Sequence, residues 1–154
     1  MSFAGRLLRA ALPLIKLRTQ LRGVSLGVRV AVFDPAGRLL LVRHSYLAGW
    51  ALPGGGVEVG ETAAQAAQRE LAEETGVALL EPPRLLGLYH NPEWTGGDHV
   101  AFFEAGAWTQ QAWRASLEIE AAAFFAPAAL PADTHASVLR RLAERAGRPV
   151  STDW

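Results

Sequence analysis

The chain has 154 residues, half of them hydrophobic and 19% charged, which favours one folded domain with a sizeable core and excludes a disordered polymer. Its formal net charge is zero, so it lacks the broad cationic surface of a dedicated DNA-binding protein. It contains no cysteine, which excludes disulfide bonds, thiolate metal sites and cysteine nucleophiles and suits a reducing, cytoplasmic location.

The beginning of the chain is basic, and the first acidic residue is Asp34. Residues 5–21 are predicted to form a helix that is bent or restarted at Pro13. The longest apolar run in this part, residues 10–15, is too short to span a bilayer, so we expect no transmembrane segment. We expect this leader to pack on its own domain or on a second subunit of a homodimer. A membrane-surface or export role is the alternative.

The remaining predicted elements follow one another through short connections. Turn residues at 34–37 are expected to join the first two strands into a β-hairpin. Thr62 and Gln65 form a capping-box pattern before a helix, and Gly76 is placed to end that helix in a left-handed conformation. The predicted order is strands at 24–33 and 38–43, a helix at 62–75, strands at 84–90, 99–107 and 118–125, and a helix at 134–146.

This order of elements predicts an α/β (α+β) fold in which helices pack on a mixed β-sheet. The expected organisation is a basic N-terminal helix within residues 1–22, a single domain at 23–148 and a C-terminal tail at 149–154.

Three carboxylates share one face of the helix predicted at 62–75. Glu70, Glu73 and Glu74 are spaced i, i+3 and i+4, within about 100° of arc, whereas Leu71 lies on a face suited to the core. Three like charges repel one another, and a bound cation would offset that repulsion. Carboxylate oxygens suit a hard ion such as Mg²⁺ or Mn²⁺, which can bridge to phosphate oxygens and activate water. Taken alone, the helix could instead present an ordinary solvated acidic face.

The residues around these glutamates form a longer pattern over residues 55–77, GGVEVGETAAQAAQRELAEETGV. In order, it contains Gly55, Glu61, Arg69-Glu70, Leu71, Glu73-Glu74, Gly76 and Val77. This stretch resembles the Nudix box, which is Gly, five residues, Glu, seven residues, Arg-Glu, an aliphatic residue, any residue, Glu-Glu, any residue, Gly and an aliphatic residue. No position departs from that pattern. The chain is therefore similar to the Nudix hydrolase (MutT-like) family, and the predicted elements along 24–146 agree with that fold.

The resemblance implies roles for the matched residues. These roles are binding of Mg²⁺ or Mn²⁺ by Glu70, Glu73 and Glu74, a backbone carbonyl ligand from Gly54 or Gly55, support from Glu61 and orientation by Arg69. The spacing of Arg69 and Glu73 also predicts a contact between them. A further catalytic acid outside the box would come from Glu118 or Glu120, of which Glu118 is preferred. Family members differ in which carboxylate is the general base, so that assignment stays open.

Clues to the substrate lie outside the box. Arg29 and Arg43, on the first two predicted strands, could bind phosphate or be ordinary surface residues. Aromatic residues in or beside loops could stack on a nucleobase or anchor their loops: Tyr46, Trp50, Tyr89 and Trp94. Pro92, 15 residues beyond Val77, resembles a marker of ADP-ribose-cleaving members. The histidines have no zinc-ligand spacing.

The preferred interpretation is an enzyme that hydrolyses the diphosphate bond of a nucleoside diphosphate linked to another group. Its substrate would be a small molecule of the NDP-sugar, ADP-ribose or nucleotide type. Two alternatives stay open: a Nudix module that binds a nucleotide with little or no cleavage, and a pyrophosphohydrolase of RNA ends or dinucleoside polyphosphates. An isopentenyl-diphosphate isomerase is disfavoured, since that chemistry looks for a cysteine.

Overall fold

The computed structural model describes residue 10 and residues 13–14, 23–93 and 96–154. Most of the helix predicted at 5–21 falls outside this part of the chain, as does Trp94. Among the residues that are described, no helix is both long and apolar enough to cross a bilayer.

The strands and helices predicted between residues 24 and 146 are confirmed, with ends that differ by a few residues. The described elements are β1 (Ser25–Ala31), β2 (Leu39–His44), β3 (Trp50–Ala51), α2 (Ala63–Thr75), β4 (Val77–Leu79), β5 (Arg84–Asn91), β6 (Asp98–Glu104), β7 (Trp108–Gln110), β8 (Ile119–Phe125) and α3 (Ala136–Arg145). Strands β3, β4 and β7 are not predicted from the sequence, because two or three residues are too few to show an alternating pattern.

The strands combine parallel and antiparallel pairs, which confirms the predicted mixed α+β class. Strand β6 lies between β1, to which it is parallel, and β5, to which it is antiparallel. Strand β2 lies between β3 and β8 and is antiparallel to both. Strands β4 and β7 form a separate antiparallel pair.

The predicted hairpin forms only next to its turn. Asp34 accepts hydrogen bonds from the backbone N–H groups of Ala36 and Arg38, and the Leu40 N–H donates to the Val32 carbonyl. Beyond this point the strands separate, because β1 pairs with β6 whereas β2 pairs with β8. The turn is therefore confirmed, but the expectation of a continuous two-stranded hairpin is wrong.

A short segment, residues 50–57, connects the two larger sheets. Its first two residues form β3 and pair with β2. Further along, the Val28 and Val30 N–H groups donate to the carbonyls of Gly55 and Pro53, and the Val57 N–H donates to the Leu26 carbonyl. Residues 53–57 therefore run along one edge of β1, and these hydrogen bonds fix the position of the glycines that precede α2.

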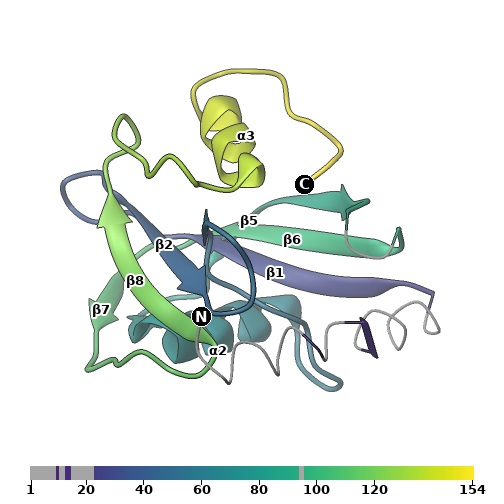
Figure 1. Cartoon of the computed structure of the whole chain (residues 1–154), viewed down its shortest axis with the longest axis horizontal. Helices are drawn as coiled ribbons and strands as arrows, with labels where there is room; N and C mark the ends of the chain where they lie inside the picture. The colour runs from purple at the N-terminus through teal and green to yellow at the C-terminus, as the bar shows by residue number, and fades with distance from the viewer. Residues whose placement is uncertain (1–9, 11–12, 15–22, 94–95) are drawn as a thin grey trace.

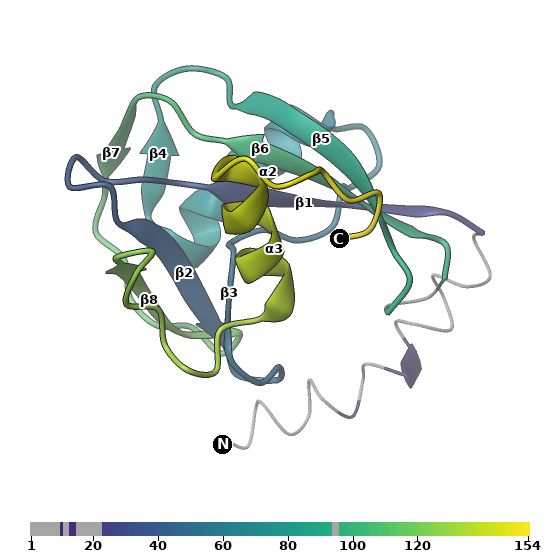
Figure 2. The ribbon, with the colours of Figure 1, turned by 90° about the horizontal axis from the view of Figure 1, so that it is seen from above.

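The two helices lie on opposite sides of the strands (Figures 1 and 2). On the α2 side, the core contains Val28 and Val30 of β1 packed with Leu71 of the helix. On the α3 side, the core contains alternate strand residues and the buried side chain of Trp154. This alternation follows from the strand geometry, in which successive side chains point to opposite faces.

Helix α2 begins and ends as its sequence predicts. The Thr62 side chain accepts a hydrogen bond from the Gln65 N–H, and the Gln65 side chain accepts one from the Thr62 N–H. Gly76 ends the helix with a φ of 71°, and a Cβ at this position would lie 2.8 Å from the Cβ of Trp113. Glycine is therefore required there for both its conformation and its size.

Candidate active site

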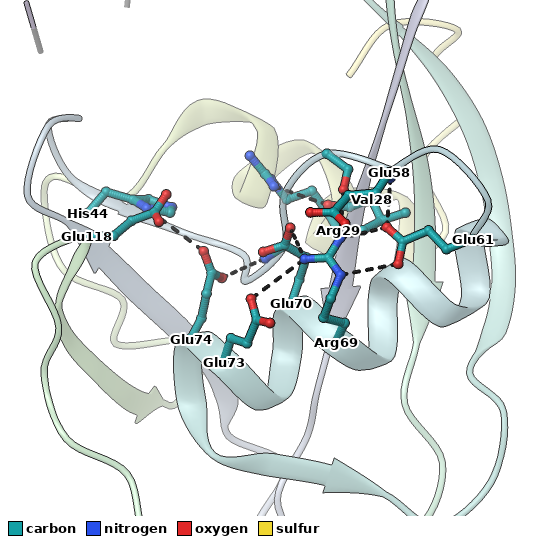
Figure 3. Close-up of polar contacts among 12 residues, drawn as sticks. Val28, Arg29, His44, Glu58, Glu61, Arg69, Glu70, Glu73, Glu74 and Glu118 are labelled. Carbon is teal, nitrogen blue, oxygen red and sulfur yellow. Dashed lines mark hydrogen bonds and ion pairs between the residues drawn. The ribbon is translucent and has the colours of Figure 1, made fainter. Parts of the chain in front are cut away.

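Helix α2 carries its three glutamates on one side, as predicted, but they differ in burial (Figure 3). Glu74 is buried, with 5% of its surface exposed, and the Glu70 side chain is 16% exposed. The Glu73 side chain is 62% exposed. Glu70 and Glu74 therefore face the protein, whereas Glu73 faces solvent.

The glycine loop, residues 54–56, allows these carboxylates to approach the backbone. The Gly54 N–H donates to Oε2 of Glu74 over 2.7 Å, and Gly54 has a φ of 139°, which disfavours any other residue. A Cβ added to Gly55 would lie 2.4 Å from Oε1 of Glu70. The missing side chain of Gly55 therefore lets Glu70 lie against the loop, whereas a Cβ at Gly54 would collide with the Val28 carbonyl of β1.

Arg69 connects the helix to the preceding loop. Its Nη2 donates to Oε1 of Glu61 over 2.6 Å, and its Nη1 donates to Oε1 of Glu70 over 2.8 Å. Nη2 also donates to the Gly56 carbonyl. The predicted contact with Glu73 is present but longer, at 3.6 Å. Arg69 thus holds Glu61 and Glu70 in fixed positions, and its hydrogen bond to Glu61 lowers the pKa of that carboxyl.

Burial changes the proton affinity of the inner carboxylates. The pKa of Glu74 is raised to about 8, mainly by burial; the negative charges of Glu70 and Glu118 add to the increase, whereas Arg29 and the Gly54 hydrogen bond oppose it. Burial also raises the pKa of Glu70, against the effect of Arg69. Arg29 on β1 is therefore a cation near both buried glutamates, at the place where an anion-binding residue is expected.

Of the two acids considered outside the motif, Glu118 is the one near this cluster. Its charge acts on Glu74, and its Oε1 accepts a hydrogen bond of 2.9 Å from the Tyr46 hydroxyl. Glu120 instead lines a shallow pocket with Arg43 and Asp133. The two residues are separated by one position near the start of β8, which explains why the sequence does not distinguish them.

The contacts of Arg43 lie outside the carboxylate cluster. Its guanidinium forms an ion pair with Asp133 and lies 5.3 Å from the centre of the Trp50 ring. Trp50 also packs edge-on against Phe125. Of the two arginines expected to meet phosphate, Arg29 lies beside the carboxylates, and the phosphate-binding role of Arg43 stays a prediction.

A family model of the NUDIX domain matches residues 24–146, which is most of the chain and includes every residue of this cluster. The chain belongs to the Nudix family. Members of this family are hydrolases that act on phosphorus-containing anhydrides.

Known Nudix relatives agree with this assignment and carry different substrate names. An RNA pyrophosphohydrolase of Dinoroseobacter shibae is 44% identical over 69 residues, which cover 44% of this chain and 41% of the relative. An ADP-ribose pyrophosphatase of Methanocaldococcus jannaschii is 36% identical over 72 residues, which cover 45% of this chain and 42% of the relative. The chain thus spans less than half the length of these curated relatives.

A solved structure agrees over a larger share of the chain. The crystal structure of a MutT NUDIX hydrolase from Burkholderia pseudomallei is 28% identical, with a TM-score of 0.66. The match covers 80% of this chain and 98% of that one. The Nudix fold therefore extends well beyond the glutamate-bearing helix.

The side chains of this Nudix site are suited to a divalent cation. Within the described ranges, no three His, Asp or Glu side chains are grouped closely enough to hold an ion as they stand. The donors are nonetheless carboxylate oxygens, the ligands that Mg²⁺ and Mn²⁺ prefer. The buried Glu74 lies beside other carboxylates, and the missing side chain of Gly55 leaves space for Glu70. A positive ion would offset the repulsion that burial creates here.

His44 lies in the site, although the sequence reasoning gave it no role. It is 4% exposed, and its Nδ1 is 4.0 Å from Oε1 of Glu74. Burial lowers its pKa to about 4, and the charge of Arg29 acts in the same direction. In the sequence His44 directly follows the strand predicted at 38–43, and its neighbour Glu74 is 30 positions away, so no local pattern links the two.

A cavity of about 270 Å³ lies on the α3 side of the Nudix fold. Its walls include Ala31 and Phe102 from the strands, Val138 from α3, and Tyr89, which is one of the aromatic residues singled out from the sequence. Leu52 also lines the cavity and precedes Gly54 by two residues. Among the described residues, the cavity shares no lining residue with the carboxylate cluster, and Leu52 is the part of its wall nearest in sequence to the glycine loop.

Proposed function

We propose that this protein hydrolyses the diphosphate bond of a nucleoside diphosphate linked to another group, using Mg²⁺ or Mn²⁺. The observation that carries this proposal is the position of Glu74, which is buried near Glu70 and Glu118 and hydrogen-bonded to the Gly54 N–H. Burying a carboxylate beside other carboxylates is unfavourable unless a cation accompanies it. The same cation is what cleavage of a diphosphate requires.

Each residue of the cluster has a definite task in this proposal. Glu70 and Glu74 would hold the cation from α2, with Glu73 as the outer ligand. When bound, the cation neutralises phosphate oxygens and lowers the pKa of the attacking water. Arg29 would attract the diphosphate, since its charge already acts on both inner glutamates. The remaining members would position these groups: Arg69 and Glu61 through their ion pair, Gly54 and Gly55 through the loop, and Glu118 as the further acid.

The group attached to the diphosphate would occupy the cavity on the α3 side. Its lining is mainly apolar, and its polar members include Arg141, which is paired with Glu144. Tyr89 is 5% exposed, and one face of its ring is covered by the Arg141 guanidinium, 3.8 Å from the ring centre. Such a lining suits an apolar or aromatic part of the attached group that packs against the walls of the cavity.

The first experiment is a cleavage screen with Mg²⁺ and with Mn²⁺. Its substrates are NDP-sugars, ADP-ribose, dinucleoside polyphosphates, oxidised nucleoside triphosphates and an RNA oligonucleotide with a 5′-triphosphate. We expect one small-molecule class to yield a nucleoside monophosphate product, and a chelator to abolish the activity. If the enzyme instead releases pyrophosphate mainly from the 5′-end of the RNA, the RNA-end alternative replaces our substrate class. Thermal protection by a nucleotide without any cleavage would instead support the binding module.

A matched pair of variants distinguishes the activity of this site from the activity of a contaminating enzyme. Glu118→Gln is expected to lower kcat, because this residue borders the buried Glu74. Glu120→Gln removes an exposed carboxylate on the same strand and is expected to leave kcat unchanged. Equal effects of both substitutions would refute the role of Glu118.

A further inference from the structure

The backbone of β2 turns His44 toward the carboxylates. The pairing of β2 with β8 shifts register between Arg43 and His44. Such irregularities redirect side chains and are frequent beside active sites. Here the Arg43 side chain contacts Asp133 and Trp50, whereas His44 is buried with its Nδ1 near Glu74. The last residue of β2 thus places an imidazole beside the most buried glutamate of the cluster.

Neither ring nitrogen of His44 has a hydrogen-bond partner among the described residues. Buried polar side chains nearly always have a partner, so a buried imidazole with two unpaired nitrogens calls for a ligand. The separation of 4.0 Å between Nδ1 and Oε1 of Glu74 is too long for a hydrogen bond. It fits two atoms bound to one ion, since atoms that each lie about 2.1 Å from a cation can be up to about 4.2 Å apart.

We propose that His44 supplies a nitrogen ligand to the divalent cation that Glu74 binds. This inference rests on the proposed function, and it changes the expected metal preference of the site. A site made only of oxygens suits Mg²⁺, whereas an imidazole favours transition-metal ions. The site of this chain therefore binds Co²⁺ and Mn²⁺ more tightly, relative to Mg²⁺, than a site composed of carboxylates alone.

Pulsed electron paramagnetic resonance of bound Mn²⁺ tests this inference without measuring activity. We expect the wild-type protein to show a nitrogen hyperfine coupling, and we expect this coupling to change when only histidine carries the heavier nitrogen isotope. In His44→Gln the coupling disappears. Titration of this variant should show an affinity for Mn²⁺ and Co²⁺ that is about tenfold lower or more, with a smaller change for Mg²⁺.

His90→Gln is the matched control, because His90 is partly exposed and contacts the Gly96 carbonyl and Asp153 away from Glu74. This variant should keep the nitrogen coupling. The isotope experiment on the wild-type protein shows whether any of the four histidines binds Mn²⁺, and the His44 and His90 variants show which one, with His44→Asn used if His44→Gln does not fold. Bound Mn²⁺ without nitrogen coupling would overturn the role of His44 and leave the carboxylate site standing. Failure of the wild type to bind Mn²⁺ or Co²⁺ would overturn both proposals.

Discussion

Glu74 combines burial, a fixed orientation and a position beside other carboxylates. Replacing it with Gln removes the charge but keeps the shape and an oxygen that can accept from the Gly54 N–H. We therefore expect Glu74→Gln to lower kcat by about two orders of magnitude or more while the protein remains folded. Steady-state kinetics and thermal unfolding of the same preparation test this. Wild-type kcat in the variant would disprove the ligand role.

The raised pKa of Glu74 also predicts how stability depends on pH. Its folded-state pKa, about 8, exceeds the ordinary value of 4.5, so its contribution to stability is complete below pH 4.5 and is lost as the pH rises toward 8. His44 acts in the opposite sense, because its pKa is lowered from 6.5 to about 4, and its contribution is lost as the pH falls through that range.

Of these two residues, only Glu74 makes the free energy of unfolding depend on pH above pH 6.5. We expect the free energy of unfolding of the metal-free protein to decrease between pH 6.5 and about pH 8. Urea denaturation in the presence of a chelator measures it. In Glu74→Gln the decrease should be much smaller, and an identical pH dependence in both proteins would show that Glu74 is not the group responsible.

At the level of elements, the junction between the glycine loop and α2 can be tested with two neighbouring glycines. A Cβ at Gly55 would collide with the Glu70 carboxylate, whereas a Cβ at Gly56 meets nothing within 4 Å. We expect Gly55→Ala to displace Glu70 and to weaken Mn²⁺ binding by about tenfold, with little effect in Gly56→Ala. Calorimetric titration with Mn²⁺ compares them. Equal affinities in both variants would show that Glu70 does not need its present position.

The face of α2 that carries Leu71 packs into the core, so we expect it to affect stability and not the reaction. Leu71 is fully buried in the core with Val28 and Val30, whereas Leu80 is 66% exposed. We expect Leu71→Ala to lower the free energy of unfolding by about 2–5 kcal/mol. Leu80→Ala should change it by less than about 0.5 kcal/mol. Chemical denaturation curves measure both, and similar losses would mean that the helix packs differently.

Local patterns explain what could be predicted at this level. The capping box and Gly76 define α2 because the interacting residues are at most four positions apart. The positions of Glu70 and Leu71 follow from the helical period. In contrast, the pairing of β1 with β6 joins residues more than 70 positions apart, so the adjacent turn at 34–37 led to the expectation of a simple hairpin. The same limit applies to His44, whose neighbour Glu74 is distant in sequence.

For the whole molecule, the two sides of the strands have different roles in our proposal. The carboxylates lie on the α2 side, and the cavity with Tyr89 lies on the α3 side. If this cavity holds the attached group, Tyr89→Leu should raise KM by up to about tenfold with little change in kcat, since the substitution reshapes the cavity wall.

Leu88→Ala is the control for this substitution, because Leu88 is the preceding residue on β5 and is 61% exposed. It should leave both KM and kcat unchanged. Tyr89 also packs on Trp154, so thermal unfolding must accompany the kinetics. An unchanged KM in Tyr89→Leu would show that the group attached to the diphosphate binds elsewhere on the protein.

The hydrogen bonds between residues 53–57 and β1 make the length of this stretch as important as its glycines. Alternate backbone groups are engaged by Leu26, Val28 and Val30. Adding or removing one residue would therefore reverse which amides point toward α2, and the Gly54 N–H would no longer reach Glu74. An inserted residue would change how the glutamate-bearing helix α2 meets β1.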